Sequence, residues 1–546
     1  MSALTVFPPL PLPGEMRAWD QGAVDLGLPE VVLMENAARA ALDVLRGCQP
    51  ELAGRHVWLF MGGGNNGGDA ACLARHLLDQ GCIPLVLHTK PLRAYTGACG
   101  RHVRLSRAAG VAFRLLHPSA LPRENPPDMV IDGLLGTGFS GTLRADILAH
   151  VRTINMLAKR SFVLALDAPS GLDGRTGRPS PEAVRAAATV CFAAGKPGLL
   201  MPHARPWTGR VHVRDIGIPR CVRQSAPCSW FLADGHCLNA LAPLPEESYK
   251  QTFGHVLVAG GAPGYEGAAH LAARAALRCG AGLVTAAAPA ASLGSVRNGW
   301  AEIMTLELPG SPRCWPSHLP ASLVDMAKKS TALVIGPGMG RSPEAAKFLE
   351  LVLDIPHRPP TVFDADALVL LSTSPRLLAR ITPEDVLTPH PGEAAALLGE
   401  STAQIQADRP TALRRLCGLC KGVVVLKGAG SLVGQSASSV LLCPYDIPQL
   451  AVGGSGDVLA GCVGGILASR GVLFREKCFL PPGISRAQAA AGAAVALHAL
   501  AGLWLASRYP VRGNTPSALA DALPLVMGQY AAEQDCGDEF PWPSSH

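Results

Sequence analysis

The residues best suited to chemistry in this chain lie in glycine-rich segments that follow apolar runs. The first such segment, GGGNNGGD at residues 62–69, follows HVWLFM and precedes a helical pattern. Backbone amides in such a turn can hold an anion, and the positive end of the helix dipole strengthens the attraction. The segment matches neither GxGxxG nor the Walker lysine motif, so the rules for common nucleotide loops do not apply. A turn closed by a capping aspartate is the structural alternative, and the segment alone does not decide between the two.

Two further polar segments end predicted strands in the first half of the chain. They are DGLLGTG at residues 132–138 and LDAPSGLD at residues 166–173. Because the carboxyl ends of parallel strands meet at one edge of a sheet, we expect these segments and residues 62–69 to face one crevice. One ligand site explains three polar turns more simply than three unrelated helix caps do.

A further glycine-rich segment, GGSGD at residues 453–457, opens a helix of small residues. Its backbone N–H groups, at a helix N-terminus, can stabilise charge on a transferred phosphoryl group. Asp457 stands where it can accept a proton from a substrate hydroxyl that attacks the phosphate. The structural alternative is again an aspartate that caps the helix. Lys427, FDAD at 363–366 and HPGE at 390–393 follow other predicted strands and favour the catalytic interpretation.

Strands alternate with helical patterns in both halves of the chain, which predicts α/β domains with parallel sheets covered on both faces. In the first half, strands are expected at the start of 56–81 and at 83–88, 128–135 and 162–166. The second series comprises 254–289, 332–340, 361–368, 385–398, 422–430 and 453–468. Residues 219–247 carry few periodic features and several prolines, so the domain boundary is placed near residues 225–227. The glycine-rich openings differ in spacing, which indicates two domains and not an internal repeat.

Composition narrows the class of protein. The 546 residues are enough for two or more domains, and an apolar content of 48% supplies large cores. The net charge is only +6 and the basic residues are scattered, so a nucleic-acid or anionic-membrane partner is not favoured. The 16 cysteines are dispersed, and many lie in apolar runs, which indicates buried thiols in a reducing compartment. Examples are Cys72, Cys191, Cys279 and Cys462.

Export and membrane insertion are not predicted. The opening MSALTVFPPLPLPGEM lacks a basic start and is broken by prolines, so it does not form a signal peptide. The apolar stretch 487–507 is mostly Ala and Gly with His498 near its centre, which favours a buried helix over a membrane span. We therefore expect a cytoplasmic protein, and the Ala-rich faces of this helix leave a homo-oligomer open. The lone CxxC of Cys417 and Cys420 is interpreted as a helix-packing pair and not as a redox or zinc site.

The first half of the chain resembles the YjeF N-terminal family, the NAD(P)H-hydrate epimerases. The resemblance covers residues 15–220 and rests on GNNGGD, DAPSG and MRAWDQGAVDLGLPEVVLMENAARAA. It implies a Rossmann-like three-layer domain over residues 1–226 that epimerises C6 of the hydrated nicotinamide ring of NADHX and NADPHX. It also implies that Asp167 lies beside the reacting ring as the catalytic residue. The implied substrate-binding positions are Asn65, Asn66, Gly67, Gly68, Asp69, Gly136, Thr137, Gly138, Phe139, Ser140, Gly141, Thr142 and Asp167.

The same resemblance implies a potassium site formed by Asn66, Asp132 and Ser170. These side chains offer oxygen and neither sulfur nor imidazole, which disfavours zinc and suits a hard cation. A single formal negative charge among them favours a monovalent ion over Ca²⁺, which usually gathers several carboxylates. Asp69 has an alternative role as a helix-terminus carboxylate.

The second half resembles the ADP/ATP-dependent NAD(P)H-hydrate dehydratases, a branch of the ribokinase-like fold. FGHVLVAGG, AALRCGAGLVT, VIGPGMG, FDADAL, TPHPGEAAALLG, VLKGAG and GGSGDVLAG occur in that family's order across residues 250–505. The resemblance implies an α/β domain over residues 227–546 that phosphorylates the C6 hydroxyl of the S hydrate with ADP and then eliminates phosphate, leaving AMP. The resemblance implies that Asp457 is the base, that Gly456 belongs to the anion hole and that Glu393 holds a Mg²⁺-bound water. The implied nucleotide-binding positions are Lys427, Gly428, Ala429, Gly430 and Ser431. The implied hydrate-binding positions are Ala268, Gly338, His390 and Asp457.

Together the two halves resemble the bifunctional NAD(P)H-hydrate repair enzymes, whose partners would be NADHX, NADPHX and ADP. The chain departs from the family pattern at 247–250, before Gly453, and at Ser431, where threonine is commoner. One alternative is a small-molecule kinase of the hydroxyethylthiazole or hydroxymethylpyrimidine type fused to a ligand-binding domain, because the GxGD loop serves those kinases too. Another is a binding or scaffold protein whose first domain has lost activity. The GNNGGD segment disfavours the kinase, and the retained oxygen-bearing residues disfavour the scaffold.

Overall fold

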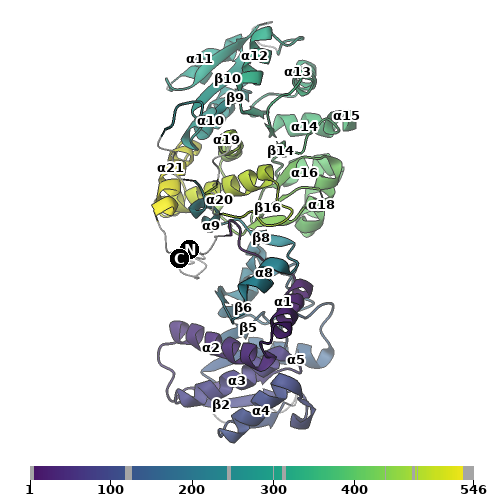
Figure 1. Cartoon of the computed structure of the whole chain (residues 1–546), viewed down its shortest axis with the longest axis vertical. Coiled ribbons are helices and arrows are strands. Elements are labelled where there is room, and N and C mark those ends of the chain that lie inside the picture. The colour runs from purple at the N-terminus through teal and green to yellow at the C-terminus, as the bar shows by residue number, and fades with distance from the viewer. Residues whose placement is uncertain are drawn as a thin grey trace. The chain divides into compact units, whose positions relative to one another are not determined.

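The computed structural model describes residues 5–116, 126–242, 247–298, 300–309, 315–436, 438–469, 474–475 and 478–532. The chain forms two compact units, which Figure 1 shows with their elements labelled. Among the described residues, the first unit comprises Pro9–Trp230, and the second comprises residues 5–8 together with those from Phe231 onward. In chain order the first unit is therefore inserted into the second. The junction at Trp230 lies close to the predicted boundary at 226/227, whereas the place of the N-terminal residues differs from the predicted domain 1–226.

The first unit is built on one parallel sheet. Its strands are β1 (His56–Met61), β2 (Ile83–His88), β3 (Ala112–Leu115), β4 (Met129–Gly133), β5 (Phe162–Leu166), β6 (Ala188–Phe192) and β7 (Arg210–Arg214). They lie in the order β3–β2–β1–β4–β5–β6–β7, and all neighbouring pairs are parallel. β4 and β6 are buried along their whole length, as expected for inner strands of a parallel sheet covered on both faces.

Helices cover both faces of this sheet. They are α1 (Pro13–Asp25), α2 (Glu30–Cys48), α3 (Asn65–Asp79), α4 (Gly97–Ala108) and α5 (Ala145–Leu157), with the short helices α6 (Pro197–Leu200), α7 (Arg205–Thr208) and α8 (Arg220–Ser225). Successive side chains of a strand point to opposite faces. Val57 and Leu59 of β1 accordingly pack in one cluster with α2, α3 and α4, whereas Trp58 and Phe60 pack in another with α5. The predicted Rossmann-like three-layer architecture is confirmed.

The strand order changes direction beside β1. From β1 the chain builds β2 and β3 on one side, and it then returns to place β4 and the later strands on the other side. In such sheets the loops at the carboxyl ends of the two strands flanking this point diverge and leave a crevice. The loops after β1 and β4, residues 62–64 and 134–144, border it.

The second unit carries a larger, mixed sheet. Its strands are β8 (Trp230–Leu232), β9 (His255–Ala259), β10 (Leu283–Pro289), β11 (Met304–Leu308), β12 (Ala332–Ile335), β13 (Thr361–Phe363), β14 (Val386–Leu387), β15 (Val423–Leu426), β16 (Ser431–Gly434) and β17 (Val440–Cys443). The order is β11–β10–β9–β12–β13–β14–β15–β16–β17–β8. The pairs from β11 to β15 are parallel, and the pairs β15–β16 and β16–β17 are antiparallel. The predicted α/β architecture of the second half is confirmed.

Two helices of the second unit, α19 and α20, are buried along most of their length. The described helices are α9 (Gly235–Asn239), α10 (Glu266–Arg278), α11 (Leu293–Arg297), α12 (Ala321–Lys329), α13 (Pro343–Leu353), α14 (Asp366–Ser372), α15 (Pro375–Leu378), α16 (Pro391–Leu398), α17 (Thr402–Ala407), α18 (Arg409–Leu419), α19 (Ser455–Ala468), α20 (Arg486–Ala506) and α21 (Pro516–Ala532). Within the described part of the chain, α20 is the helix long and apolar enough to span a membrane. Nearly all of its residues are buried inside the unit, so the prediction of a buried helix at 487–507 is confirmed.

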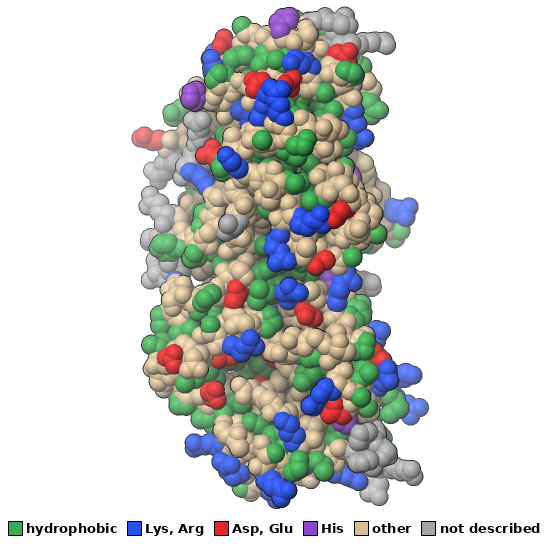
Figure 2. All heavy atoms as spheres, turned by 90° about the vertical axis from the view of Figure 1, so that its right-hand side faces the viewer, with side chains coloured by type: hydrophobic (Ala, Val, Ile, Leu, Met, Phe, Trp, Pro, Cys, Tyr) green, Lys and Arg blue, Asp and Glu red, His purple; other side chains and the backbone are tan. Residues whose placement is uncertain are grey.

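The surface and the cysteines agree with the composition. Figure 2 shows basic and acidic side chains interspersed over the visible face, as expected from the small net charge. Cys72, Cys191, Cys279 and Cys462 are free, buried thiols, as predicted. The CxxC cysteines, Cys417 and Cys420, are buried free thiols as well.

Candidate active sites

A cavity of about 540 Å³ opens at the carboxyl edge of the first sheet. It lies where α3 begins after β1 and where the loops after β4 and β5 start, so the three polar segments meet there as a parallel sheet requires. The predicted substrate positions that line it are Asn65, Asn66, Asp69, Gly136, Thr137, Gly138, Phe139 and Asp167.

The other predicted substrate positions lie outside the cavity lining. A Cβ on Gly67 would stand 2.1 Å from the Gly62 carbonyl oxygen, and one on Gly68 would stand 2.5 Å from the Met34 sulfur. These two glycines therefore allow close packing of the loop and of α2 against α3. Ser140, Gly141 and Thr142 are exposed in the loop after β4 and do not border the cavity.

Asp167 is held in a single orientation at the end of β5. Its backbone adopts the left-handed region, with φ of 60°, which is uncommon outside glycine and is often found at functional sites. Its Oδ2 accepts hydrogen bonds from the Thr137 hydroxyl at 2.6 Å and from the Thr137 amide at 3.1 Å. Its Oδ1 lies 2.7 Å from the Lys196 ammonium. Burial opposes ionisation, but the charge and hydrogen bond of Lys196 together with the bonds from Thr137 lower the pKa of Asp167.

Lys196 is a functional candidate that the sequence analysis missed. Its side chain is fully buried, lines the cavity, and donates to Asp167 and to the Phe192 carbonyl oxygen. Burial alone would lower the pKa of this ammonium, but the neighbouring carboxylate raises it, so the lysine stays charged. Lys196 follows β6 just as Asp167 follows β5. The same reasoning about strand ends, applied to β6, would identify Lys196 from the sequence.

Two more carboxyl groups line the same cavity, and the pKa of each is raised, whereas that of Asp167 is lowered. Burial, together with the charges of Asp167 and Asp20, raises the pKa of Asp69 well above its ordinary value. Burial also raises the pKa of Asp20 to about 6, with Lys196 opposing the shift. Asp69 lies beyond the start of α3 at Asn65, so it is not the residue that caps the helix. Asp20 comes from α1 and carried no strand-end signal in the sequence.

The residues predicted for potassium are linked by hydrogen bonds, because Asn66 and Ser170 both donate to the Leu135 carbonyl oxygen and Ser170 also donates to Asp132. Ser170 donates from its hydroxyl to Asp132 Oδ1 at 2.6 Å and from its amide to Oδ2 at 2.7 Å. Asn66 donates its Nδ2 to the Leu135 carbonyl oxygen at 2.9 Å, and its buried Oδ1 has no hydrogen-bond partner. Burial raises the pKa of Asp132 to about 6, against the hydrogen bonds from Ser170 and Leu134. The set therefore combines a bare amide oxygen with a buried carboxylate.

In the second unit, Asp457 lies in the first turn of α19. The turn before the helix needs glycine at Gly454, where φ is 97° and a Cβ would stand 2.7 Å from Leu271. His498 of α20 lies with its Nε2 3.0 Å from the Ser455 carbonyl oxygen and anchors the same turn. Burial raises the pKa of Asp457 to about 7, aided by Asp364 and opposed by Lys427. The helix begins at Ser455 after Gly454, so Asp457 does not cap it.

Lys427, predicted to contact the nucleotide, forms ion pairs with two carboxylates. Its ammonium lies 2.7 Å from Asp364 Oδ1 and 3.8 Å from Glu393 Oε2. A Cβ on Gly456 would stand 3.5 Å from the same nitrogen, so the lysine reaches the glycine loop that carries Asp457. Asp364 is held further by the Thr388 hydroxyl at 2.6 Å. Lys427 thus links the segments that follow β13, β14 and β15 to the glycine loop that carries Asp457.

His390 and Glu393 form a capping box at the start of α16. The His390 Nδ1 accepts hydrogen bonds from the Gly392 and Glu393 amides, and Glu393 Oε2 accepts from the His390 amide at 2.8 Å. This fixes the His390 ring in a half-exposed position at the edge of the site. Burial raises the pKa of Glu393 to about 7, aided by Asp364 and opposed by Lys427.

The remaining predicted positions of the second unit fall into two groups. Ala268 and Gly338 are neighbours, because a Cβ on Gly338 would stand 3.0 Å from the Ala268 methyl group. Gly428 and Ala429 are exposed in the turn between β15 and β16, and Ser431 Oγ donates to the Gly428 carbonyl oxygen at 2.9 Å. Gly430 is buried in the same turn.

Comparison with known proteins assigns a family to each unit. The family model described as "YjeF-related protein N-terminus" matches residues 30–198, and the model described as "NAD(P)H-hydrate dehydratase" matches residues 256–525. Among solved structures, a ribokinase-like superfamily protein from Enterococcus faecalis is 26% identical, with a TM-score of 0.46. The match covers 55% of this chain and 96% of that one.

Curated relatives match both units together. The bifunctional NAD(P)H-hydrate repair enzyme of Moorella thermoacetica is 36% identical over 93% of this chain and 94% of its own length. The protein of the same name from Coxiella burnetii is 35% identical over 84% of this chain and 89% of its own length. Because such identity extends through both units and nearly the full length of these relatives, the chain belongs to the family of bifunctional NAD(P)H-hydrate repair enzymes.

Proposed function

We propose that this chain repairs hydrated nicotinamide nucleotides by two successive activities. The first unit interconverts the R and S forms of NADHX and NADPHX. The second unit dehydrates the S form to NADH or NADPH at the expense of ADP, releasing AMP and phosphate. The supporting observation is that one chain, in a family of this name, carries two sites with a lysine–aspartate pair beside further carboxyl groups of raised pKa. We place the reaction in the cytoplasm, where the 14 described cysteines remain free thiols.

Epimerisation needs an acid and a base at one carbon. Inversion at C6 requires that a bond to that carbon break and form again on the other face of the ring. The raised pKa of Asp69 favours its protonated form, as a donor to the departing oxygen, and the lowered pKa of Asp167 favours its ionised form, as an acceptor. Two carboxyl groups with opposed protonation states in one cavity are typical of such a pair. Lys196 stabilises the charge of Asp167, and Thr137 fixes its orientation.

Potassium fits the oxygen set beneath this cavity. Asn66 presents a buried amide oxygen without a hydrogen-bond partner, and the hydrogen-bond donors described for Asp132 are all neutral. A monovalent cation between Asn66, Asp132 and Ser170 would coordinate the unpaired Asn66 oxygen and balance the negative charge of Asp132. When bound, it would supply a fixed positive charge that holds the loops after β1, β4 and β5 together.

Dehydration by the second unit needs a base and a site for a phosphoryl group. Asp457, with a pKa of about 7, accepts the proton of the C6 hydroxyl. The hydroxyl oxygen bonds to the terminal phosphorus of ADP, and the bond from that phosphorus to AMP breaks. Loss of phosphate from C6 with a proton from the neighbouring ring carbon then restores the double bond. Gly456 and the N-terminus of α19 offer backbone N–H groups to the transferred group.

The nucleotide and its metal are assigned to the segments around Lys427. We place the ADP along residues 427–431 and the hydrate near Ala268, Gly338 and His390. Mg²⁺ would accompany the phosphates. Because Lys427 already pairs with Asp364 at 2.7 Å, Glu393, at 3.8 Å from the same ammonium, is the carboxylate with more capacity to hold a magnesium-bound water.

One assay tests both activities. A mixture of R and S NADHX is incubated with the full chain, and the recovery of absorbance by reduced nicotinamide is followed with and without ADP. Complete recovery with ADP, and none without it, is expected. Recovery of only the S fraction would contradict the epimerase assignment, and absence of ADP-dependent recovery would contradict the dehydratase assignment.

A further inference from the structure

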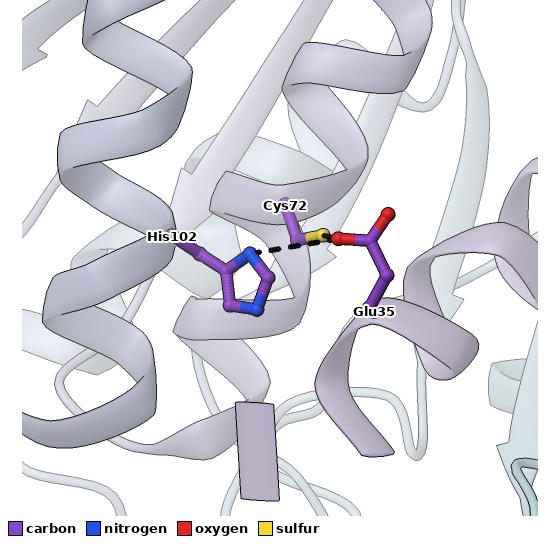
Figure 3. Close-up of side chains that lie close together, drawn as sticks. All are labelled: Glu35, Cys72 and His102. Carbon is purple, nitrogen blue, oxygen red and sulfur yellow. Dashed lines mark hydrogen bonds and ion pairs between the residues drawn. The ribbon is translucent and has the colours of Figure 1, made fainter. Parts of the chain in front are cut away.

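A cluster of metal-ligating side chains lies in the first unit, away from the residues that line its cavity. It consists of Glu35 from α2, Cys72 from α3 and His102 from α4, which Figure 3 shows facing one another. One ligand atom from each, a carboxylate oxygen, a sulfur and a ring nitrogen, all lie within 4.8 Å of one another. Cys72 and His102 are almost fully buried, with exposed fractions of 0% and 1%. The cluster therefore joins three helices, with two of its side chains buried and that of Glu35 30% exposed.

The ring of His102 leaves a lone pair without a partner. Its Nε2 lies 3.1 Å from the Val31 carbonyl oxygen, which can only accept, so Nε2 carries a hydrogen. In the neutral ring, Nδ1 then holds a lone pair, and this buried atom makes no hydrogen bond. It points toward Glu35 Oε2 at 3.8 Å, which is itself an acceptor. A metal-ligating histidine typically has this arrangement, with its second nitrogen donating to a backbone carbonyl.

Cys72 and Glu35 supply the other two ligands. The Cys72 sulfur lies 3.2 Å from Glu35 Oε2, which places sulfur and nitrogen on the same carboxylate oxygen. Separations of 3.2 and 3.8 Å are of the size expected between atoms that share a tetrahedral ion with bonds of about 2.0–2.3 Å. His76, one turn after Cys72, has its Nε2 2.9 Å from Glu35 Oε1.

We propose that Glu35, Cys72 and His102 bind a divalent zinc ion, with His76 or water in the fourth position. A thiolate, an imidazole and a carboxylate together suit zinc, whereas Mg²⁺ and Ca²⁺ take oxygen ligands. Arg75, which contacts both oxygens of Glu35 at 2.8 and 2.6 Å, is the competing partner of the carboxylate. Zinc binding would shift this arginine toward Oε1, and binding would release the thiol proton of Cys72.

The site would act on the neighbouring cavity through the helices. α2 lines the cavity with Glu30, Leu33 and Met34, and α3 lines it with Asn65 and Asp69. An ion that cross-links α2, α3 and α4 would hold these two walls at a fixed separation. The role is structural, so we expect zinc to raise the thermal stability of the protein without entering the reaction.

The experiment uses the full chain, purified without oxidants, stripped with a chelator and titrated with Co²⁺ as a spectroscopic substitute for Zn²⁺. We expect a thiolate-to-cobalt charge-transfer band that saturates at one equivalent. Cys72→Ser should lose that band, and His102→Gln should weaken cobalt binding by at least the roughly 10–100-fold that follows loss of outer-shell contacts. Cys82→Ser is the matched control, because Cys82 is a buried thiol of the same unit that donates to the Leu52 carbonyl oxygen.

The outcomes separate a metal site from a buried ion pair. If wild type shows no charge-transfer band, or if the band persists in Cys72→Ser, the site is overturned and the cluster is a Glu35–Arg75 ion pair with two neighbours. The melting temperature of each variant is also measured with and without Zn²⁺. Each variant is compared with its own metal-free form, so that a loss of stability caused by the substitution itself does not affect the comparison. A rise in the melting temperature in wild type and Cys82→Ser, but not in Cys72→Ser or His102→Gln, supports the site, and an equal rise in all four overturns it.

Discussion

The two candidate active sites contain the same buried ion pair but use it differently. In the first unit Lys196 lies 2.7 Å from Asp167, and in the second Lys427 lies 2.7 Å from Asp364. In the first, the paired aspartate is the one that faces the cavity, and pairing keeps it ionised. In the second, the aspartate proposed as the base, Asp457, remains outside the pair and has a raised pKa.

This difference indicates which proton transfers each site can support. A carboxylate held by lysine and threonine is a weak base of fixed charge, so the proposed epimerisation needs a separate acid, and the raised pKa of Asp69 suits that role. An unpaired aspartate with a pKa of about 7 can gain and lose a proton near neutral pH. Under the proposed function, the first site therefore divides the acid and the base between Asp69 and Asp167, whereas the second site uses Asp457 as its base.

The largest effect is expected from Asp457→Asn. Removal of a positioned general base typically costs about 10²–10⁴-fold, so dehydration of the S hydrate should fall by that factor. The substitution keeps the shape of the side chain, so nucleotide binding and the melting temperature should change little. The measurement is ADP-dependent recovery of absorbance from the S hydrate, with R-to-S conversion by the same preparation as the control. Turnover within a few-fold of wild type would show that Asp457 is not the general base and has only a structural role in the first turn of α19.

Asp167→Asn should stop R-to-S conversion and leave dehydration of the S hydrate unchanged, because the two sites lie in separate units. We expect a loss of about 10²-fold or more. The variant, incubated with racemic hydrate and ADP, should recover only the S fraction. Thr176→Ser, a conservative change at a half-buried position in the loop after β5, serves as the control. Complete recovery at a rate above spontaneous epimerisation would mean that Asp167 is not needed.

The pH dependence should differ between the two activities. Asp457 must be ionised to accept a proton, so kcat/KM for dehydration should fall as the pH drops below about 7, by about tenfold per pH unit. Burial is the main cause of that raised pKa, with Asp364 adding to it. The base of the first site keeps a lowered pKa, so Asp167 should not cause loss of epimerisation in the same range. Superimposable pH profiles of the two activities would contradict the comparison.

The smallest effect concerns potassium. The full chain should melt at a higher temperature in potassium than in matched sodium buffer, and Asp132→Ala should remove the difference. Each kcal/mol of differential binding corresponds to about 2–4 °C for a unit of this size. An unchanged melting temperature, together with an anomalous-scattering map that is empty at Asn66, Asp132 and Ser170, would remove the assignment.

The strands and the meeting of their polar ends could be predicted from the sequence. The predicted strands at 83–88 and 162–166 coincide with β2 and β5, because inner strands of a parallel sheet are continuous apolar runs bounded by polar turns. The same topology brings Asn66, Asp132 and Ser170 together. Strand pairing in β16 and β17 was not predicted, since short antiparallel strands carry little periodicity.

The partners inside each site could not be predicted from spacing alone. Lys427 is predicted to contact the nucleotide, and its ammonium also lies between Asp364 and Glu393, which spacing along the chain does not show. Asp20 comes from a helix, where no strand-end rule applies. Gly67 and Gly68 share the loop motif with the cavity residues, yet their neighbours are the loop backbone and Met34.

The N-terminal residues through Pro8 belong to the second unit, and this affects how the chain is made. Phe7 is fully buried and packs edge-on against Phe474 at 6.4 Å, and the Val6 amide donates to the Phe479 carbonyl oxygen. These residues precede the first unit in the chain, whereas their partners Phe474 and Phe479 follow it. The whole of the first unit is therefore synthesised before the second unit can bury Phe7. A truncation that starts at residue 227 would also remove Phe7 from the core of the unit it was meant to isolate.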